Sequence, residues 1–400
     1  MAPGPPVPLG RSRRRKGRRR VSPDADDAAR PEDMARPQTS TRDRDEVRAR
    51  LEAWLAGRHG DKTPWVHELA VPDGTGMSSE TLLFDVTWSD GTHDRLVARL
   101  APDADAVPVF PRYDLDLQYA TMSEVAARSA VPVPPLYAFE PDPVHLGTEF
   151  LVMHRVEGVV PADIPPYVFG AGWLAEAAPE DRLRLQRNVV QVLADLHAIA
   201  DPEAAFPWYV PPAGTSALRA HVDSQREFAD WVLDGRDGPL IEAGFAWLDE
   251  HWPADEGETV LSWGDARIGN IMFDDFAPVA VLDWEMASLA PREVDLGWTI
   301  YLHRFFDDIA LQFGLPGMPD FMRRSHLAGL YHELTGHAPR DLDWYTAYAA
   351  LRHAVIMTRI GTRSARFGEA EMADDIDDLI THRAALEAML AGTYWGSVPA

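Results

Sequence analysis

The segment from Leu261 to Trp298 constrains the fold of this chain more than any other stretch. It runs through an apolar lead-in, a polar loop, a short strand, a turn, a second strand and another polar loop. The first polar loop contains Asp265, the second contains Asp283, and Asn270 follows Asp265 by five residues. Because a hairpin returns the chain to its starting point, we predict that the two polar loops lie side by side.

Two carboxylates and an amide brought together in this way suit the transfer of a phosphoryl group to an alcohol. The transfer needs a carboxylate that orients the hydroxyl and accepts its proton, and oxygen ligands for the metal ion on the nucleotide phosphates. We assign the first role to Asp265 and the magnesium ligands to Asn270 and Asp283, because Mg²⁺ prefers hard oxygen ligands. Each residue alone is more simply a turn or cap residue, so the prediction depends on all three occurring together.

Hydrophobic periodicity predicts two unlike parts. Strands predominate between residues 65 and 156, whereas amphipathic helices predominate afterwards, the last of them over residues 372–391. The Leu261–Trp298 segment lies among those helices. We therefore predict an α+β fold with a β-rich N-terminal lobe over residues 41–157 and a mainly helical C-terminal lobe over residues 158–400.

Charge and composition narrow the kinds of partner. Residues 1–40 are rich in Pro, Arg, Asp and Ala and predict a disordered tail, within which residues 11–20 hold eight basic side chains. The formal net charge of the whole chain is −25, so an acidic body argues against nucleic acid as the main partner. There is no cysteine, which fits a reducing compartment. No apolar run approaches the roughly 20 residues of a membrane span, and we expect a cytoplasmic protein.

A glycine-containing turn joins the predicted strands 65–71 and 81–88. Gly74 and Gly76 permit close approach of a ligand to the backbone, whose N–H groups, together with Ser78, could bind phosphate oxygens. The turn is neither a dinucleotide-binding fingerprint nor a P-loop, because no helix and no Gly-Lys-Ser/Thr follow it. A plain hairpin turn remains the alternative.

These motifs resemble those of the aminoglycoside phosphotransferase/choline kinase family of protein-kinase-like small-molecule kinases. The His-Gly-Asp-x4-Asn motif of that family corresponds to Trp263–Asp265 followed by Asn270, its second metal-binding aspartate to Asp283, and a downstream structural aspartate to Asp295. The resemblance covers nearly the whole chain after residue 45. It implies a bilobal protein-kinase-like fold, ATP and Mg²⁺ as cofactors, and a small-molecule hydroxyl as the acceptor.

The cation expected at the phosphates departs from the family pattern. The chain has only two lysines, Lys16 and Lys62, and Arg99 stands on the strand where the family has its lysine. A guanidinium keeps the positive charge and offers a planar fork to phosphate oxygens. Gln118 stands where the family has a helix glutamate and could hold the guanidinium by hydrogen bonding, with Glu124 as the other candidate partner.

The hinge motif of the family begins at Met153, and the match implies adenine contacts from the His154 carbonyl and the Val156 amide. His197 lies on an apolar helix, where a hydrogen-bonded structural histidine is expected rather than a metal ligand. By analogy with the family, residues that select the acceptor should lie around 160–175 and 300–325.

The acceptor and the activity leave alternatives. Parts of the sequence resemble a branch sometimes joined to acyl-CoA dehydrogenases, for which hydroxyacyl compounds are alternative substrates. The loss of the lysine and glutamate motivates a second alternative, a catalytically inactive nucleotide-binding pseudokinase. A protein kinase is disfavoured, because the segment after Asp283 leaves no room for a long activation loop.

Overall fold

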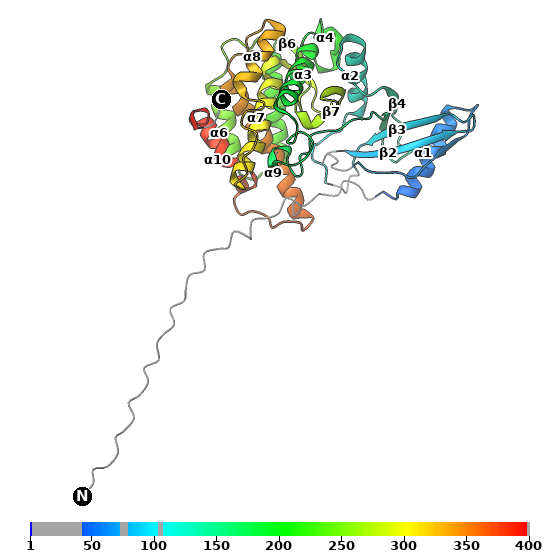
Figure 1. Ribbon diagram of the computed structural model, residues 1–400, viewed down its shortest axis with the longest axis horizontal. Helices are drawn as coiled ribbons and strands as arrows, with labels where there is room; N and C mark the ends of the chain where they lie inside the picture. Colours follow the sequence, from blue (N-terminus) through cyan, green and yellow to red (C-terminus); the bar gives the residue numbers. More distant parts are fainter. Residues whose placement is uncertain (2–41, 73–78, 103–106, 398–400) are drawn as a thin grey trace.

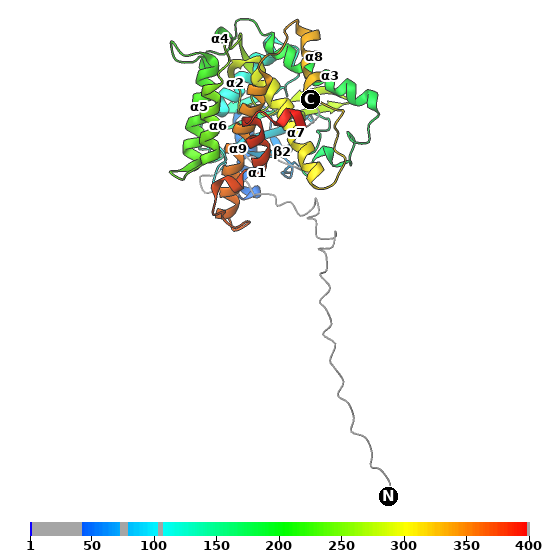
Figure 2. The ribbon, with the colours of Figure 1, turned by 90° about the vertical axis from the view of Figure 1, so that its left-hand side faces the viewer.

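The computed structural model describes residues 42–72, 79–102 and 107–397, together with Met1. The predicted tail over residues 1–40 therefore lies, apart from Met1, outside the described part of the chain. Figure 1 shows a sheet flanked by helix α1 (Arg44–Arg58) beside a larger body of helices, and the turned view of Figure 2 looks onto those helices. The predicted α+β fold, with a β-rich N-terminal lobe and a mainly helical C-terminal lobe, is confirmed.

An antiparallel sheet of five strands, in the order β1-β2-β3-β5-β4, forms the first part. The strands are β1 (Pro64–Val66), β2 (Glu80–Trp88), β3 (His93–Leu100), β4 (Leu136–Glu140) and β5 (Phe150–His154). The alternating apolar residues of β2 share one buried face, as a half-buried strand requires. Leu82, Phe84 and Val86 on this face join a core with Leu51 of α1 (Arg44–Arg58).

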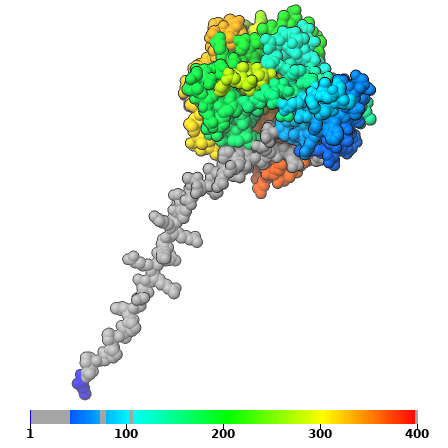
Figure 3. Space-filling view, turned by 45° about the vertical axis from the view of Figure 1, so that its right-hand side comes forward, coloured from blue at the N-terminus to red at the C-terminus, as the bar shows by residue number. Residues whose placement is uncertain are grey.

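The opposite face of the sheet connects it to the rest of the molecule. Helix α2 (Leu115–Arg128) contacts β4 and β5. Its buried residues Met122 and Val125 belong, with Val97 and Leu151 of the sheet, to the large core that the helices build. The space-filling view shows the blue and cyan N-terminal elements seated against the green helices (Figure 3). One face of the sheet is therefore continuous with the helical core.

The longer helices that follow are α3 (Pro179–His197), α5 (Ala217–Leu233), α6 (Pro239–Glu250), α7 (Arg292–Gln312), α8 (Arg324–Thr335), α9 (Leu342–Arg366) and α10 (Arg383–Leu390). Shorter helical turns are η3 (Tyr167–Phe169), α4 (Pro202–Ala205), η4 (Pro207–Tyr209), η6 (Ile376–Leu379) and α11 (Tyr394–Ser397). Helix α9 packs against α5, α6, α7 and α10, and it is buried along most of its length. None of the helices in the described ranges has the length and apolar character to cross a membrane.

The predicted helix over residues 372–391 is wrong in its first half. The side chain of Asp375 accepts from the backbone N–H of Asp377 and begins the short turn η6. The backbone then extends at Ile380 before α10 begins. A local cap has therefore replaced the continuous helix that the apolar spacing indicates.

The Leu261–Trp298 segment contains two pairs of strands, and one pair is nested within the other in the sequence. Its strands are β6 (Thr259–Ser262), β7 (Ile271–Asp274), β8 (Ala277–Val281) and β9 (Ser288–Pro291). The chain reverses between β7 and β8 at Asp275 and Phe276, whose φ angles of 45° and 61° suit a two-residue hairpin turn. Pairing of β6 with β9 closes the outer ends of the segment. The two polar loops therefore meet, as predicted from the hairpin.

Candidate active site

Asp265 lies in the loop after β6, and three donors fix its carboxylate. The indole N–H of Trp298 donates to Oδ1 at 2.7 Å. The amide of Asn270 and Nε of Arg267 donate to Oδ2, at 2.6 Å and 3.1 Å. The short turn η5 (Ile268–Asn270) brings the amide within reach. Oδ1 has one donor, so it keeps a lone pair with which to accept a further proton.

Main-chain contacts hold the Asp283 loop against the Asp265 loop. The N–H of Leu282 donates to the carbonyl of Asn270 at 2.8 Å. The indole of Trp263 donates to the carbonyls of Leu282 and Asp283, at 2.9 Å and 3.2 Å. Trp263, which stands at the histidine position of the family motif, therefore ties the two loops together. The three predicted residues Asp265, Asn270 and Asp283 lie on these two joined loops.

A buried carboxylate at the start of α7 anchors the chain before Asp265. Asp295 is fully buried and accepts from the hydroxyl of Ser262 (2.8 Å) and from the N–H groups of Trp263 (2.8 Å) and Gly264 (2.9 Å). It also lies 3.2 Å from Nε2 of His197. Burial opposes the charge of Asp295, but the hydrogen bonds outweigh it and lower its pKa. The expected structural role of His197 is thus matched by its contacts.

Replacing Asp295 by Asn should destabilise the protein by about 2–4 kcal/mol at pH 7, because an NH₂ group would face buried backbone donors. The lowered folded pKa means that ionised Asp295 stabilises the fold above its unfolded pKa of about 3.9. This contribution is lost as the pH falls through the folded pKa. In urea unfolding, the difference in the free energy of unfolding between wild type and Asp295→Asn should therefore become smaller at acid pH. Asp230→Asn, an exposed change on α5, should leave the unfolding free energy unchanged.

Gly264 allows the Asp265 loop to lie directly on the Asp283 loop. Its φ is +89°, in the left-handed region, and a Cβ built there would lie 2.0 Å from the carbonyl oxygen of Met286. No side chain fits at that distance. The contact therefore requires glycine at this position for reasons of both backbone conformation and space.

Arg99 reaches from β3 across to the Asp283 loop. Its Nη2 donates to Oδ1 of Asp283 at 2.9 Å and lies 3.6 Å from a carboxylate oxygen of Glu285. Nε and Nη2 also donate to the hydroxyl of Ser79, at 3.2 Å and 2.7 Å. Burial opposes the charge of Arg99, but Asp283 and Glu285 outweigh it and raise its pKa. Arg99 therefore links the start of β2 to a predicted magnesium ligand.

The helix partner predicted for Arg99 is not one of its hydrogen-bonding partners within the described residues. Gln118 is buried on α2, whereas Arg99 uses Ser79 and Asp283. The other candidate, Glu124, pairs with Arg128 on the helix surface. The Asp283 carboxylate carries a full negative charge, so it is a stronger partner for the guanidinium than an amide is.

The remaining predicted nucleotide residues fall in two places. Gly74, Gly76 and Ser78 lie outside the described residues, although Ser79 directly after them is buried against Arg99. The second group is at the end of the sheet, where Met153 and His154 finish β5 and Val156 follows, half-buried. These residues form the start of the connection between the sheet and the helical part.

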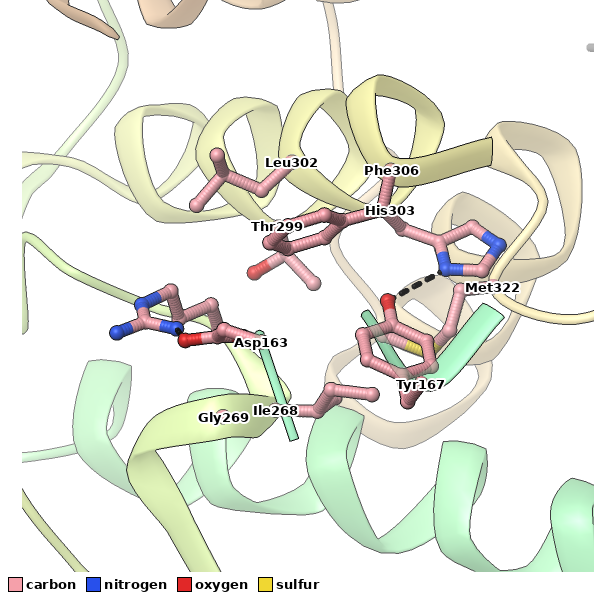
Figure 4. Close-up of a pocket in the computed structure, with 10 residues that line it drawn as sticks. Asp163, Tyr167, Ile268, Gly269, Thr299, Leu302, His303, Phe306 and Met322 are labelled. Atoms are coloured by element: carbon pink, nitrogen blue, oxygen red, sulfur yellow. Dashed lines mark hydrogen bonds and ion pairs between the residues drawn. The ribbon is translucent and has the colours of Figure 1, made fainter. Parts of the chain in front are cut away.

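A small pocket lies beside the Asp265 loop (Figure 4). Apolar and aromatic side chains predominate in its lining, which consists of Asp163, Tyr167, Arg267, Ile268, Gly269, Thr299, Leu302, His303, Phe306 and Met322. The two segments singled out from the sequence, 160–175 and 300–325, thus line one pocket. Arg267 forms an ion pair with Asp163 and a hydrogen bond with Asp265, so it joins the pocket wall to the loop.

Charges in this pocket are internally compensated. Burial opposes the charge of Arg267, but Asp163 and Asp265 outweigh it and raise its pKa. Burial lowers the pKa of His303 to about 4, so its imidazole is neutral at neutral pH. The hydroxyl of Tyr167 lies 2.8 Å from Nδ1 of His303 (Figure 4). The pocket therefore presents one ion pair, Arg267 with Asp163, and otherwise uncharged side chains.

Sequence reasoning missed two residues that contact this site, namely Arg267 and Trp298. Arg267 carried a signal, because it is the only charged residue between Asp265 and Asn270. Trp298 lies three positions after Asp295, one helical turn along α7, so the two share a face of the helix. Asp163 lies in the segment 160–175 singled out from the sequence, but its pairing with Arg267 could not be predicted, because the two residues are far apart in the sequence.

Comparison with known proteins gives relatives at low identity. A protein of Arabidopsis thaliana named as a probable acyl-CoA dehydrogenase is 24% identical over 314 residues, which are 72% of this chain and 36% of that protein. Acyl-CoA dehydrogenase family member 11 of Gallus gallus is 29% identical over 195 residues, which are 48% of this chain and 23% of that protein. The chain thus spans little more than a third, at most, of these curated relatives.

Solved structures share the fold. A protein of Ralstonia eutropha named as an aminoglycoside phosphotransferase is 22% identical with a TM-score of 0.61, covering 88% of this chain and 99% of its own. A mutant aminoglycoside phosphotransferase in complex with AMP-PNP and hygromycin B is 16% identical with a TM-score of 0.52, covering 86% and 99%. At these identities the likeness shows the fold alone, which is protein-kinase-like.

A sequence profile decides the family. The profile of the phosphotransferase enzyme family matches residues 76–322, which are more than half of the chain. The matched range includes β3 with Arg99 and both polar loops. The chain therefore belongs to the phosphotransferase enzyme family.

Proposed function

We propose that this phosphotransferase transfers the γ-phosphate of ATP to a hydroxyl group of a small molecule. The observation that carries the proposal is the hydrogen bond between Asp265 and Asn270, on a loop joined to the one that carries Asp283, whose carboxylate Arg99 reaches from the sheet. This arrangement supplies a base for the acceptor, oxygen ligands for a metal ion and a cation for the phosphates. A cysteine-free sequence supports a cytoplasmic setting.

The donor set fits Mg²⁺. The amide oxygen of Asn270 and the carboxylate of Asp283 are hard oxygen ligands. Asp283 already attracts a cation, since Nη2 of Arg99 lies 2.9 Å from its Oδ1. Magnesium-bound ATP would supply the phosphoryl group. Asp265, held by three donors, orients the acceptor hydroxyl and accepts its proton.

The sheet would bind the nucleotide. Arg99 would contact the phosphates together with the turn that contains Gly74, Gly76 and Ser78. The adenine would contact the end of β5 and the residues after it. These are the groups assigned from the sequence, at Met153, His154 and Val156. Gln118 remains a proposed neighbour of the phosphates through its buried position on α2.

Replacing Arg99 by Ala should weaken binding of Mg²⁺–AMP-PNP about 10- to 100-fold, because a charged hydrogen-bonding group at the phosphates is lost. Isothermal titration of the full chain measures the change. Arg99→Lys should recover part of the affinity, since it keeps the charge but loses the planar fork. Arg128→Ala, which breaks a surface pair on α2, serves as the control and should bind normally. Equal affinities of Arg99→Ala and wild type would exclude the assigned role.

The pocket favours one class of acceptor over another. Its carboxylate, Asp163, is already paired with Arg267, and its other walls are apolar or neutral. Most of the side chains that line the pocket are apolar or aromatic, which favours an acceptor with an apolar body and a hydroxyl group over a polycationic aminoglycoside. The names of the curated relatives point in the same direction. We therefore propose a hydroxyacyl compound, such as a hydroxyacyl thioester, as the first acceptor to test.

A panel assay tests the function. Full-length protein with Mg²⁺–ATP is incubated with aminoglycosides, choline-like amines, sugars and hydroxyacyl thioesters, and ³¹P NMR identifies any phosphate ester. We expect an ester with a hydroxyacyl compound. If Mg²⁺–ATP raises the melting temperature but no acceptor is phosphorylated, the pseudokinase alternative is favoured. If neither occurs, nucleotide binding itself is wrong.

A further inference from the structure

Arg352, in the middle of α9, is a buried cation that stability does not explain. Only 1% of its surface is exposed. The described residues give its guanidinium one hydrogen bond, while Nε and Nη1 are buried without a hydrogen-bonding partner. No carboxylate in the described ranges forms an ion pair with it. Burial lowers the pKa of Arg352. An incompletely paired buried charge destabilises a fold, so its presence needs another reason.

Two contacts of Arg352 lead to Asp265, and a third places its Cζ 5.8 Å from the ring centroid of Tyr348. Its Cζ lies 4.4 Å from the ring centroid of Trp298, whose indole N–H donates to Oδ1 of Asp265. A cation over an indole ring is attracted to the ring face and makes the N–H a better donor. Its Nη2 donates to the carbonyl of Gly264 at 3.1 Å. That carbonyl belongs to the peptide group that joins Gly264 to Asp265.

We infer that Arg352 is a positioning residue that fixes the orientation of the Asp265 carboxylate. It holds the main chain of Asp265 through the Gly264 carbonyl and the side chain through Trp298. Arg352 itself does not contact Asp265 by a hydrogen bond or an ion pair within the described residues. The inference rests on the proposed function, because it assigns Asp265 the role of orienting the acceptor hydroxyl.

Two substitutions on α9 separate positioning from packing. Arg352→Met keeps the length of the side chain and removes the buried charge. It should lower kcat about 10- to 100-fold through misorientation of Asp265. The KM for ATP should stay unchanged, and the melting temperature should be no lower than that of wild type. Arg359→Met is the matched control, since Arg359 also stacks on a tryptophan, Trp231, and also donates to a carbonyl, at Pro108, but does not contact the Asp265 loop.

The hydrogen bond itself can be observed without any activity. In protein labelled with ¹⁵N-tryptophan, the indole signal of Trp298 is assigned by its disappearance in Trp298→Phe. A donor bound to a carboxylate resonates downfield, so Arg352→Met should move this signal upfield, and Arg359→Met should not. Protein that phosphorylates nothing on the panel but shows this shift would disprove the proposed function while leaving the Arg352–Trp298–Asp265 linkage intact.

Two results would overturn the inference. The first is an unchanged Trp298 indole signal in folded Arg352→Met. The second is a loss of kcat in Arg352→Met that comes with a lower melting temperature, together with a similar loss of kcat in Arg359→Met. Such a result would indicate that the arginines of α9 have a structural role. Arg352→Lys, which keeps a cation near Trp298 but has three N–H donors instead of five, should fall between wild type and Arg352→Met in both kcat and indole shift.

Discussion

Asp265→Asn should lower the rate of phosphoryl transfer by about 10²- to 10⁴-fold, the usual contribution of a general base. The amide is almost the same size and still accepts the indole N–H of Trp298 on its oxygen. It cannot accept the proton of the acceptor hydroxyl, and its NH₂ group would face the donors of Asn270 and Arg267. Steady-state kinetics with the acceptor found in the panel measures the loss.

The size of this effect depends on binding being preserved. The affinity for Mg²⁺–AMP-PNP should remain within about threefold of wild type, because the assigned phosphate and metal contacts come from other residues. Asp230→Asn, an exposed change on α5, should behave as wild type. A variant Asp265→Asn that retains more than a tenth of the wild-type kcat would rule out Asp265 as the base.

Gly264→Ala should destabilise the protein by about 3 kcal/mol or more and abolish activity, since backbone must move to admit a Cβ. The Met286 carbonyl oxygen would lie 2.0 Å from it. Relief of that clash separates the Asp265 loop from the Asp283 loop. Urea unfolding measures the stability, and the transfer assay measures the activity.

Gly91 offers a control with almost the same backbone. Its φ is +86°, against +89° for Gly264, but a Cβ there meets nothing within 4 Å. Gly91→Ala should therefore destabilise the protein only by the cost of placing an alanine in the left-handed region, about 1–2 kcal/mol, and should keep its activity. Equal losses of stability in the two variants would mean that the loops adjust to each other freely, contrary to the close contact described above.

Local spacing in the sequence was enough to predict the joined loops. Asp265 and Asn270 lie five residues apart, and one short turn brings them into hydrogen-bonding distance. The two-residue turn of the hairpin then returns the chain, so that the N–H of Leu282, next to Asp283, donates to the carbonyl of Asn270. Hydrophobic periodicity also predicted the β-rich and the helical parts, because the period of a strand or a helix depends only on residues that are close together in the sequence.

Contacts between distant elements could not be predicted in this way. Arg99 meets Asp283 across 184 positions, and Arg352 meets Gly264 across 88. The packing of the helices against the sheet determines which of these residues meet, and local sequence patterns do not predict that packing. The sequence accordingly assigned Gln118 to Arg99 and missed Trp298 altogether. The apolar spacing also predicted that the last helix begins at residue 372, but the side-chain cap of Asp375 begins a short turn there instead.

An arginine on β3 gives the protein a chemical resistance that a lysine would not. Reactive acyl donors and acetyltransferases neutralise lysine amines and leave guanidinium groups charged. Of the two lysines in the chain, Lys16 lies outside the described residues and Lys62 pairs with Asp90 at the protein surface. The cation that faces Asp283 would therefore survive acylation, and a lysine-directed affinity label should leave this phosphotransferase active.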